Sequence, residues 1–155
     1  MFSLTPGSAH AVSVVREREL DYKKAMKKAG FPHAPIHRIA LEAPDRLQAL
    51  RNYLLSASRP KAVFCWSDLD ALQLLHQASE LGLRVPEDLA IIGYDNSPTA
   101  GLNQIGLASM DQNSMTLGKL AGETLLTRIG GRRAPVKLLV EPQFANRRSA
   151  SSPEG

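Results

Sequence analysis

Four groups of polar residues in this chain have the types and the spacing expected of a ligand-binding site. Three of them follow short apolar runs, where buried strands are expected to end, and the fourth lies inside a probable helix. The groups are Ser67 with Asp68, Asp95 with Asn96, Asp111 with Gln112, and the run Arg16, Glu17 and Arg18. Short acceptors and amides beside one guanidinium suit a hydroxylated small molecule that is held by hydrogen bonds.

Each group also has a simpler structural interpretation. Asp68 stands where a helix N-cap is expected, and Asp95 with Asn96 is suited to an Asx-turn. Gln112 fits a solvated loop, and Arg18 fits a surface ion pair. The expectation that all of them converge at the carboxyl ends of neighbouring strands is what favours a binding site.

The elements that must position these groups alternate between strands and helices. Apolar runs of strand length predict strands at residues 2–5, 36–41, 62–66, 89–94, 107–110 and 136–140. Amphipathic patterns predict helices over 11–29, from a cap at 45 to about 58, from 68 to 81, and from 113 or 114 to 129. Alternation at this spacing predicts an α/β fold built of parallel βαβ units.

Composition sets few limits on function. The chain has 155 residues, a net charge of +4 and a pI of about 9.5, which by itself suggests nucleic acid. The lysines at 23, 24, 27 and 28 instead fit the solvated face of one helix, and no aromatic platform or zinc-finger spacing accompanies them. Arg132 and Arg133, which precede the last predicted strand, are placed to contact a phosphate backbone. Charge alone does not decide between these interpretations.

The single cysteine, Cys65, excludes an intramolecular disulfide and a multi-cysteine metal site. We expect neither a metal nor another cofactor. No apolar stretch approaches the length of a membrane span, and the first residues show no signal-peptide pattern. The sequence therefore predicts a cytoplasmic protein without a membrane partner.

An enzymatic alternative rests on Asp68 and Asp70. Their spacing after a strand imitates the Asp-x-Asp motif of haloacid-dehalogenase-type phosphatases, in which the first carboxylate attacks phosphorus. Leu72 stands where that motif normally has Thr or Val. Cys65 lies within an apolar run with no histidine placed to activate it, so no catalytic residue is predicted.

Two long stretches carry a family resemblance. The runs Val63–Asp68 and Gly82–Asn96 resemble the hallmark region of the lactose-repressor (LacI/GalR) family of transcription regulators. Leu107–Gln112, Leu117 with Gly118, and Arg147–Ser149 continue the resemblance, which extends from about residue 2 to 149. It implies a type I periplasmic-binding-protein-like fold, a parallel three-layer α/β sandwich of which this chain holds mostly the second subdomain.

The resemblance also implies roles for the candidate residues. Arg18 is expected to contact an effector, Asp95 to accept hydrogen bonds from its hydroxyl or imino groups, and Gln112 to face the cleft from a crossover between subdomains. Ser67 stands at a polar contact that is usually Asn, and Trp66 is unusual at its strand end. The Trp66 ring suits either stacking on a sugar or base, or simple packing.

Further roles concern structure and organisation. Asp68 matches the family's aspartate that caps the following helix. The whole chain, 1–155, would be a partial effector-binding domain, with residues 1–110 as the core of the second subdomain and 150–155 as a disordered tail. Residues 111–149 would be a crossover, helix and strand normally shared with a first subdomain that is missing here.

The resemblance predicts the sensing portion of a regulator without its helix-turn-helix headpiece. Its partners would be a sugar or nucleobase effector, a second copy in a homodimer, and DNA only through the absent headpiece. Because the 114–129 helix lacks its usual neighbour, we expect a second chain or a rearranged packing to cover its apolar face. A fragment of a periplasmic sugar-binding protein is the alternative with the same fold.

Overall fold

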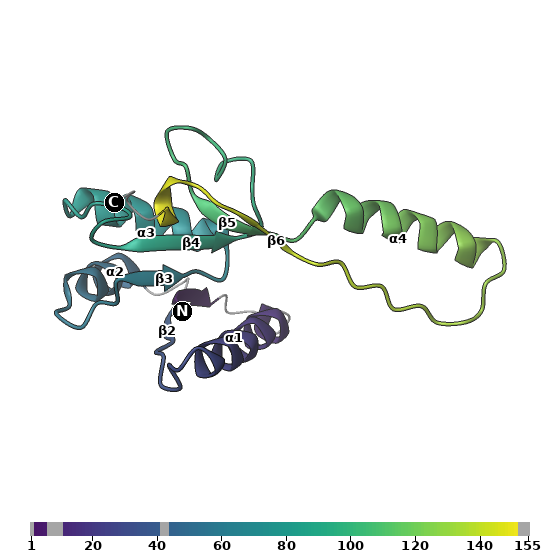
Figure 1. The fold of residues 1–155 in the computed structure, drawn as a ribbon, viewed down its shortest axis with the longest axis horizontal. Helices are drawn as coiled ribbons and strands as arrows, with labels where there is room; N and C mark the ends of the chain where they lie inside the picture. The colour runs from purple at the N-terminus through teal and green to yellow at the C-terminus, as the bar shows by residue number, and fades with distance from the viewer. Residues whose placement is uncertain (1, 6–10, 41–43, 152–155) are drawn as a thin grey trace.

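The computed structural model describes residues 2–5, 11–40 and 44–151 of the chain. Strands and helices alternate along it (Figure 1). The elements are β1 (Phe2–Thr5), α1 (Ala11–Lys28), β2 (His37–Ala40), α2 (Arg46–Leu55), β3 (Ala62–Phe64), α3 (Asp68–Glu80), β4 (Ala90–Tyr94), β5 (Ala108–Asp111), α4 (Ser114–Ile129), β6 (Gln143–Ala145) and the 3-10 turn η1 (Arg148–Ala150). The predicted order of elements is confirmed as far as α4.

The sheets bring the ends of three strands to one edge. β3, β4 and β5 are neighbours and run parallel, β6 pairs antiparallel with β5, and β1 pairs with β2 in parallel. Phe64 lies opposite Ile92, and Tyr94 lies opposite Met110. The mostly parallel α/β fold class is therefore confirmed, with β6 as the antiparallel exception.

The two faces of the main sheet are covered differently. Successive residues of a strand point to opposite faces, and β4 alternates between half-buried and buried side chains. The buried face packs against α2 and α3; its core includes Leu50, Leu54, Val63, Cys65, Ala71, Leu74, Ala78 and Ile91. The opposite face meets α1, where the Tyr22 ring stacks on Phe64 at 6.5 Å between centroids. Helices on both faces give the predicted three layers (Figure 1).

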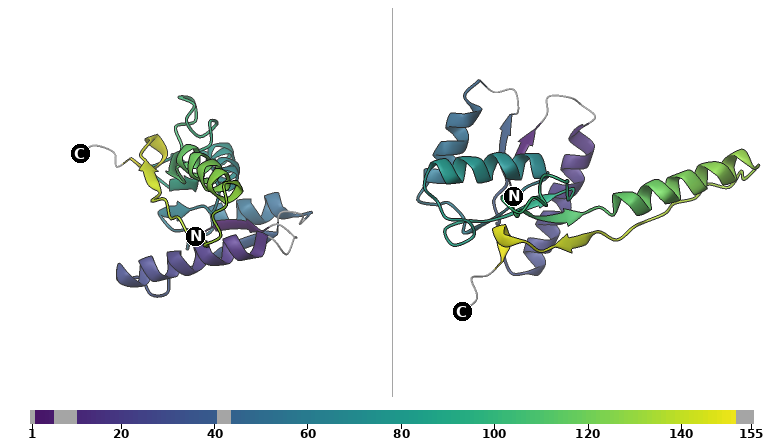
Figure 2. Two further views of the ribbon diagram at one scale, coloured as in Figure 1. Left: turned by 90° about the vertical axis from the view of Figure 1, so that its right-hand side faces the viewer. Right: turned by 90° about the horizontal axis from the view of Figure 1, so that it is seen from above.

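Beyond β5 the chain forms a projecting arm, which we define as residues 112–142 (Figures 1 and 2). It contains α4, none of whose residues is buried, and an extended segment that returns to β6. The prediction of a strand at 136–140 is wrong for this structure, because none of the described strands pairs with that segment. β6 begins only at Gln143, where the returning chain reaches β5.

The predicted tail starts within an ordered turn. Ala150 belongs to η1, and Ser149 is only 2% exposed. The Ser149 hydroxyl donates to the carbonyl of Ile91 and accepts from the backbone N–H of Ala108, which fixes η1 against β4 and β5. Residues 152–155 of the predicted tail lie outside the described residues. Within the described residues, no helix is long and apolar enough to cross a membrane.

Candidate functional site

The candidate site lies at the carboxyl ends of β3, β4 and β5. The parallel register places Trp66, Asp95 and Gln112 at the same edge of the sheet, each just after its strand. α1 crosses the half-buried face and brings Arg18 to this edge. Four of the five predicted effector-binding residues are therefore brought together.

Arg18 is at the centre of the cluster. Its side chain is 16% exposed, and its guanidinium donates to the backbone carbonyl of Trp66 and pairs with Asp95 at 3.6 Å. The same group lies 3.9 Å from the centroid of the Tyr94 ring and 5.6 Å from that of Trp66. Planar stacking of this kind is characteristic of arginine, because its guanidinium is flat and weakly hydrated.

Asp95 is the acceptor that faces Arg18. The side-chain amide of Gln112 donates to the Asp95 carboxylate at 2.5 Å. The Asp95 backbone has a φ of 109°, which is strained for any residue other than glycine. Burial raises the pKa of the Asp95 carboxyl and nearby Asp68 adds to this, while Arg18 and Gln112 lower the pKa but do not cancel the rise. Strain and a net electrostatic penalty at one residue fit a group retained for binding rather than for stability.

Trp66 has one polar atom without a partner. Its indole Nε1 is buried and makes no hydrogen bond with any residue that the structure describes. The ring instead contributes its face to the Arg18 cluster. Whether this face stacks on a ligand stays a prediction.

The helix cap expected at Asp68 belongs to Ser67. The predicted cap at Asp68 is wrong: Ser67 is the N-cap of α3, and its hydroxyl accepts from the backbone N–H of Asp70 at 3.2 Å. Ser67 has the extended backbone that a cap requires, whereas Asp68 is already the first helical residue. Ser67 is also only 8% exposed, so its predicted effector contact stays a prediction without further support.

Asp68 is buried beside the site and holds the surrounding backbone by hydrogen bonds. Its carboxylate is 2% exposed and accepts from the backbone N–H of Ser97 and from the hydroxyl of Ser109, both at 2.6 Å. These bonds connect the start of α3 to the loop after β4 and to β5. Asp68 therefore fixes the loop that carries Asp95 to α3, and α3 to β5.

A second supporting group joins two residues of the predicted polar groups, Asn96 and Asp111, to Arg147, which was not predicted at the site. Asn96 donates through its amide to Asp111 at 2.9 Å and accepts from Arg147 at 2.6 Å. Arg147 also donates to the carbonyl of Leu107 at 2.7 Å. Arg147 lies far from the site in sequence, and only the family resemblance of its segment gave a signal. Tyr94 was also missed, although strand alternation places it on the face that meets α1.

The raised pKa of the Asp95 carboxyl gives a testable pH dependence. Since its pKa is raised in the folded state, stability is lost as pH rises from the ordinary carboxyl value of 3.8 through the folded pKa. Asp95→Asn is therefore expected to raise the free energy of unfolding at pH 7, by less than about 1 kcal/mol because the side chain is 40% exposed and screened. The gain should disappear at a pH below 3.8, as measured by urea unfolding at both pH values.

Asp88→Asn is the control with the opposite sign. Hydrogen bonds from Arg84 hold the pKa of the Asp88 carboxyl at about 2, so this carboxylate stabilises the fold at neutral pH and its benefit is lost as pH falls towards 2. Asp88→Asn should lower stability at pH 7. If Asp95→Asn lowered the free energy of unfolding at pH 7 as Asp88→Asn does, the conclusion that the charged Asp95 carboxylate destabilises the fold would be contradicted.

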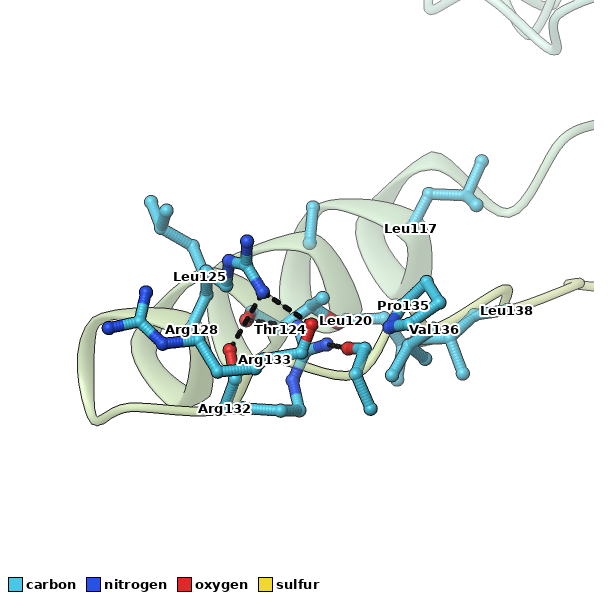
Figure 3. A pocket seen from close by; sticks show the side chains of 12 residues that line it. Leu117, Leu120, Thr124, Leu125, Arg128, Arg132, Arg133, Pro135, Val136 and Leu138 are labelled. Atoms are coloured by element: carbon cyan, nitrogen blue, oxygen red, sulfur yellow. Dashed lines mark hydrogen bonds between the residues drawn. The ribbon is translucent and has the colours of Figure 1, made fainter.

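An open cavity of about 350 Å³ adjoins the cluster. It is lined mostly by aromatic and apolar side chains of α1 and the half-buried sheet face: Tyr22, Ala25, Phe64, Tyr94 and Met110, with Arg18 and Asp21 at its polar end. Its volume lies in the range of small-molecule pockets. A larger cavity of about 670 Å³ lies on the arm, lined only by α4 and residues 132–138, and so shares no residue with this cluster (Figure 3).

The geometry does not favour the phosphatase alternative. Asp68 and Asp70 are each 2% exposed, and the carboxylate of Asp68 is occupied by Ser97 and Ser109. Burial raises the pKa of the Cys65 thiol, which keeps it protonated and unreactive. No group of three or more metal-ligating side chains is found among the described residues.

Comparison with known proteins gives a consistent family. A model of the periplasmic binding protein-like domain matches residues 2–150. The transcriptional repressor PurR of Escherichia coli O1:K1 is 36% identical over 133 residues, which are 84% of this chain and 39% of that protein. The chain therefore spans well under half the length of this curated relative.

Two solved structures agree with this result. A LacI-family regulator from Corynebacterium glutamicum is 27% identical with a TM-score of 0.73, covering 97% of this chain and 58% of that one. A complex of the transcriptional regulator CelR with cellobiose is 29% identical with a TM-score of 0.75, covering 96% and 46%. The resemblance found in the sequence is confirmed, and the chain belongs to the family of periplasmic binding protein-like domains, in the form found in LacI-type transcription regulators.

Proposed function

We propose that this chain is the effector-sensing part of a LacI/GalR-type transcription regulator. The observation that carries the proposal is the Arg18–Asp95 pair, which Gln112 completes at the carboxyl edge of a parallel sheet. Ligands of such sheets bind at this edge, and these three side chains bring donors and acceptors together there. No step of this function requires turnover of the ligand.

The effector we propose is a neutral, hydroxylated or imino-bearing small molecule, either a sugar or a nucleobase. Arg18 and Asp95 already neutralise each other, so the pair does not demand a charged ligand. The Tyr94 and Trp66 rings offer faces to a sugar ring or a base. The cellobiose bound to CelR supports the sugar class.

The described cluster would form one wall of a cleft. Residues 1–110 would be the core of one lobe, and residues 111–149 a crossover, helix and strand that pack with a second lobe in longer relatives. A ligand that bridges two lobes shifts the population between hinge angles by its differential affinity for the two states. This chain alone is therefore expected to bind its effector weakly.

The partners follow from the same proposal. DNA would be bound through a helix-turn-helix headpiece outside these 155 residues, in a homodimer, and the regulator would act in the cytoplasm. The supporting observation is the likeness to repressors and regulators that are longer than this chain.

A thermal-shift screen of the 155-residue chain tests the proposal. Sugars, including cellobiose, and free nucleobases are added at increasing concentration, and a true effector is expected to raise the melting temperature progressively. Inorganic phosphate serves as a matched anionic control, and it should give no shift. If no neutral sugar or nucleobase stabilises the chain while phosphate does, the proposed effector class is wrong.

A further inference from the structure

Helix α1 carries a buried carboxylate on the face that meets the sheets. The side chain of Glu19 is only 10% exposed, and both of its oxygens accept hydrogen bonds from Arg38 of β2. Nε of Arg38 donates at 2.6 Å, and the second bond comes from its Nη2. Two parallel hydrogen bonds from a planar guanidinium to a carboxylate restrict the two groups to one relative orientation.

The alternation of β2 explains how Arg38 reaches the helix. Ile39 packs against the core, and His37, on the same side of the strand, contacts the Tyr53 ring of α2 at 4.5 Å. Arg38 therefore points to the opposite face, where α1 lies. The ion pair fastens α1 to the two-stranded sheet, whereas Arg18 of the same helix contacts the site on the four-stranded sheet.

Arg18 and Glu19 are consecutive residues of one helix, so a rotation of the helix moves both. Successive residues are about 100° apart around the helix axis, which places these two at the margins of the buried face with Tyr22 between them. Tyr22 stacks on Phe64 at 6.5 Å, and rings stacked at this distance accept a range of offsets. The directional contact that sets the rotation is therefore the one at Glu19.

Stability does not explain a charge at this position. A buried carboxylate loses its hydration, and replacing a buried ion pair by apolar side chains of similar volume is often neutral or stabilising. Val15, one helical turn earlier on the same face, is 5% exposed and shows that apolar packing is possible there. An apolar contact at residue 19 would hold α1 on the sheet but would not give it a direction.

We infer that Glu19 and Arg38 are positioning residues for effector binding. Their ion pair fixes the rotation of α1 and thereby the approach of Arg18 to Asp95 and to the carbonyl of Trp66. Neither residue is expected to touch the effector, since Arg38 lies on β2, outside the cluster at the ends of β3, β4 and β5. This role rests on the proposed function, which gives the position of Arg18 its consequence.

A double variant, Glu19→Met with Arg38→Met, separates positioning from stability. Methionine supplies adaptable apolar volume without charge or direction, so the melting temperature should equal or exceed that of the original chain. Arg38→Met alone should lower the melting temperature, because it leaves the Glu19 carboxylate buried without its counter-charge. Circular dichroism during heating measures both.

Proton NMR of the free chain reports the position of Arg18. Its guanidinium lies 3.9 Å from the centroid of the Tyr94 ring, so its Hε resonance should be shifted upfield, and Arg18→Lys identifies that resonance by its loss. We expect the double variant to lose most of the shift. Trp66 fluorescence with an effector from the thermal-shift screen should give a dissociation constant about three- to tenfold above the original, because one charged hydrogen bond is weakened but not removed.

Arg84→Met with Asp88→Met is the matched control. It removes an ion pair with the same Nε and Nη2 donors, both at 2.9 Å, from an exposed place outside the cluster. The Arg18 resonance and the dissociation constant should not change in this control.

The positioning role is overturned if the Glu19–Arg38 double variant keeps the upfield shift or the original dissociation constant. A double variant that melts well below the original chain also overturns it, because the pair would then hold the fold rather than the direction of α1. If no sugar or nucleobase binds the original chain, the proposed function fails, and the resonance of the free chain still decides whether the pair holds Arg18.

Discussion

Replacing Gly93 by alanine is expected to destabilise the chain by about 3 kcal/mol or more. A Cβ atom at this position would lie 2.2 Å from Oδ1 of Asp68 and 3.2 Å from Cδ2 of Leu107. Asp68 has nowhere to go, because it is 2% exposed and holds Ser97 and Ser109 through two short hydrogen bonds. The alanine therefore costs both overpacking and the loss of bonds to a buried carboxylate. Urea unfolding at neutral pH measures the change.

A double-mutant cycle separates this mechanism from a general intolerance of β4. In an Asp68→Ala background the obstructing carboxylate is absent, so Gly93→Ala should cost at least about 1 kcal/mol less than in the original chain. Gly122→Ala is the control, since a Cβ on this helical glycine meets no atom within 4 Å. It is expected to stabilise the chain by up to about 1 kcal/mol. Additive effects of Gly93→Ala and Asp68→Ala would contradict the steric explanation.

Most of the fold was predictable because its elements bury apolar side chains with clear periods. The runs at β3 and β4 are continuous and apolar, which is typical of strands covered on both faces. The predicted face of α3 is only partly right, because Ala71, Leu74 and Ala78 enter the core while Leu69 is 61% exposed. The exception is the segment 136–140. Its alternation is that of a strand, but pairing depends on a neighbour, which local sequence does not encode.

The site was predictable to the extent that it depends on strand ends. Trp66, Asp95 and Gln112 meet because parallel strands end at one edge, and this follows from topology alone. The contact of Arg18 with Tyr94 depends on how α1 lies across the sheet, which periodicity does not determine. Ser67 and Asp68 are adjacent and both are good caps. Tertiary hydrogen bonds that occupy Asp68, which local sequence does not show, leave the cap to Ser67.

Arg18 and Asp95 already have partners within the cluster. Arg18 is stacked, paired and hydrogen-bonded without any ligand, and Asp95 accepts from Gln112. An effector must therefore exchange these contacts for its own, so affinity is expected to depend on Arg18 in two opposing ways. Losing its hydrogen bonds to the ligand weakens binding, whereas removing its internal competition for Asp95 strengthens it. We expect the loss of a charged hydrogen bond to the ligand to have the larger effect on affinity. The competing Arg18–Asp95 pair is weaker because Asp95 is partly exposed to solvent.

Arg18→Ala is accordingly expected to weaken binding of an effector found in the thermal-shift screen by about 10- to 100-fold. Arg18→Lys should recover little of this, because an ammonium keeps the charge beside Asp95 but has no flat group to lie on the Tyr94 ring and no planar fork of donors. Trp66 is the only tryptophan of the chain and lies 5.6 Å from Arg18, so its fluorescence provides the titration signal.

Arg84→Ala is the matched control, since it removes the same charge from an exposed pair with Asp88 far along the chain from the cluster. Its dissociation constant should stay within about twofold of the original, as exposed ion pairs contribute little. Circular dichroism and the melting temperature without ligand establish that the Arg18 variants are folded. If Arg18→Ala binds the effector as tightly as the original chain does, the stacked guanidinium only holds α1 on the sheet, and the ligand must be recognised elsewhere.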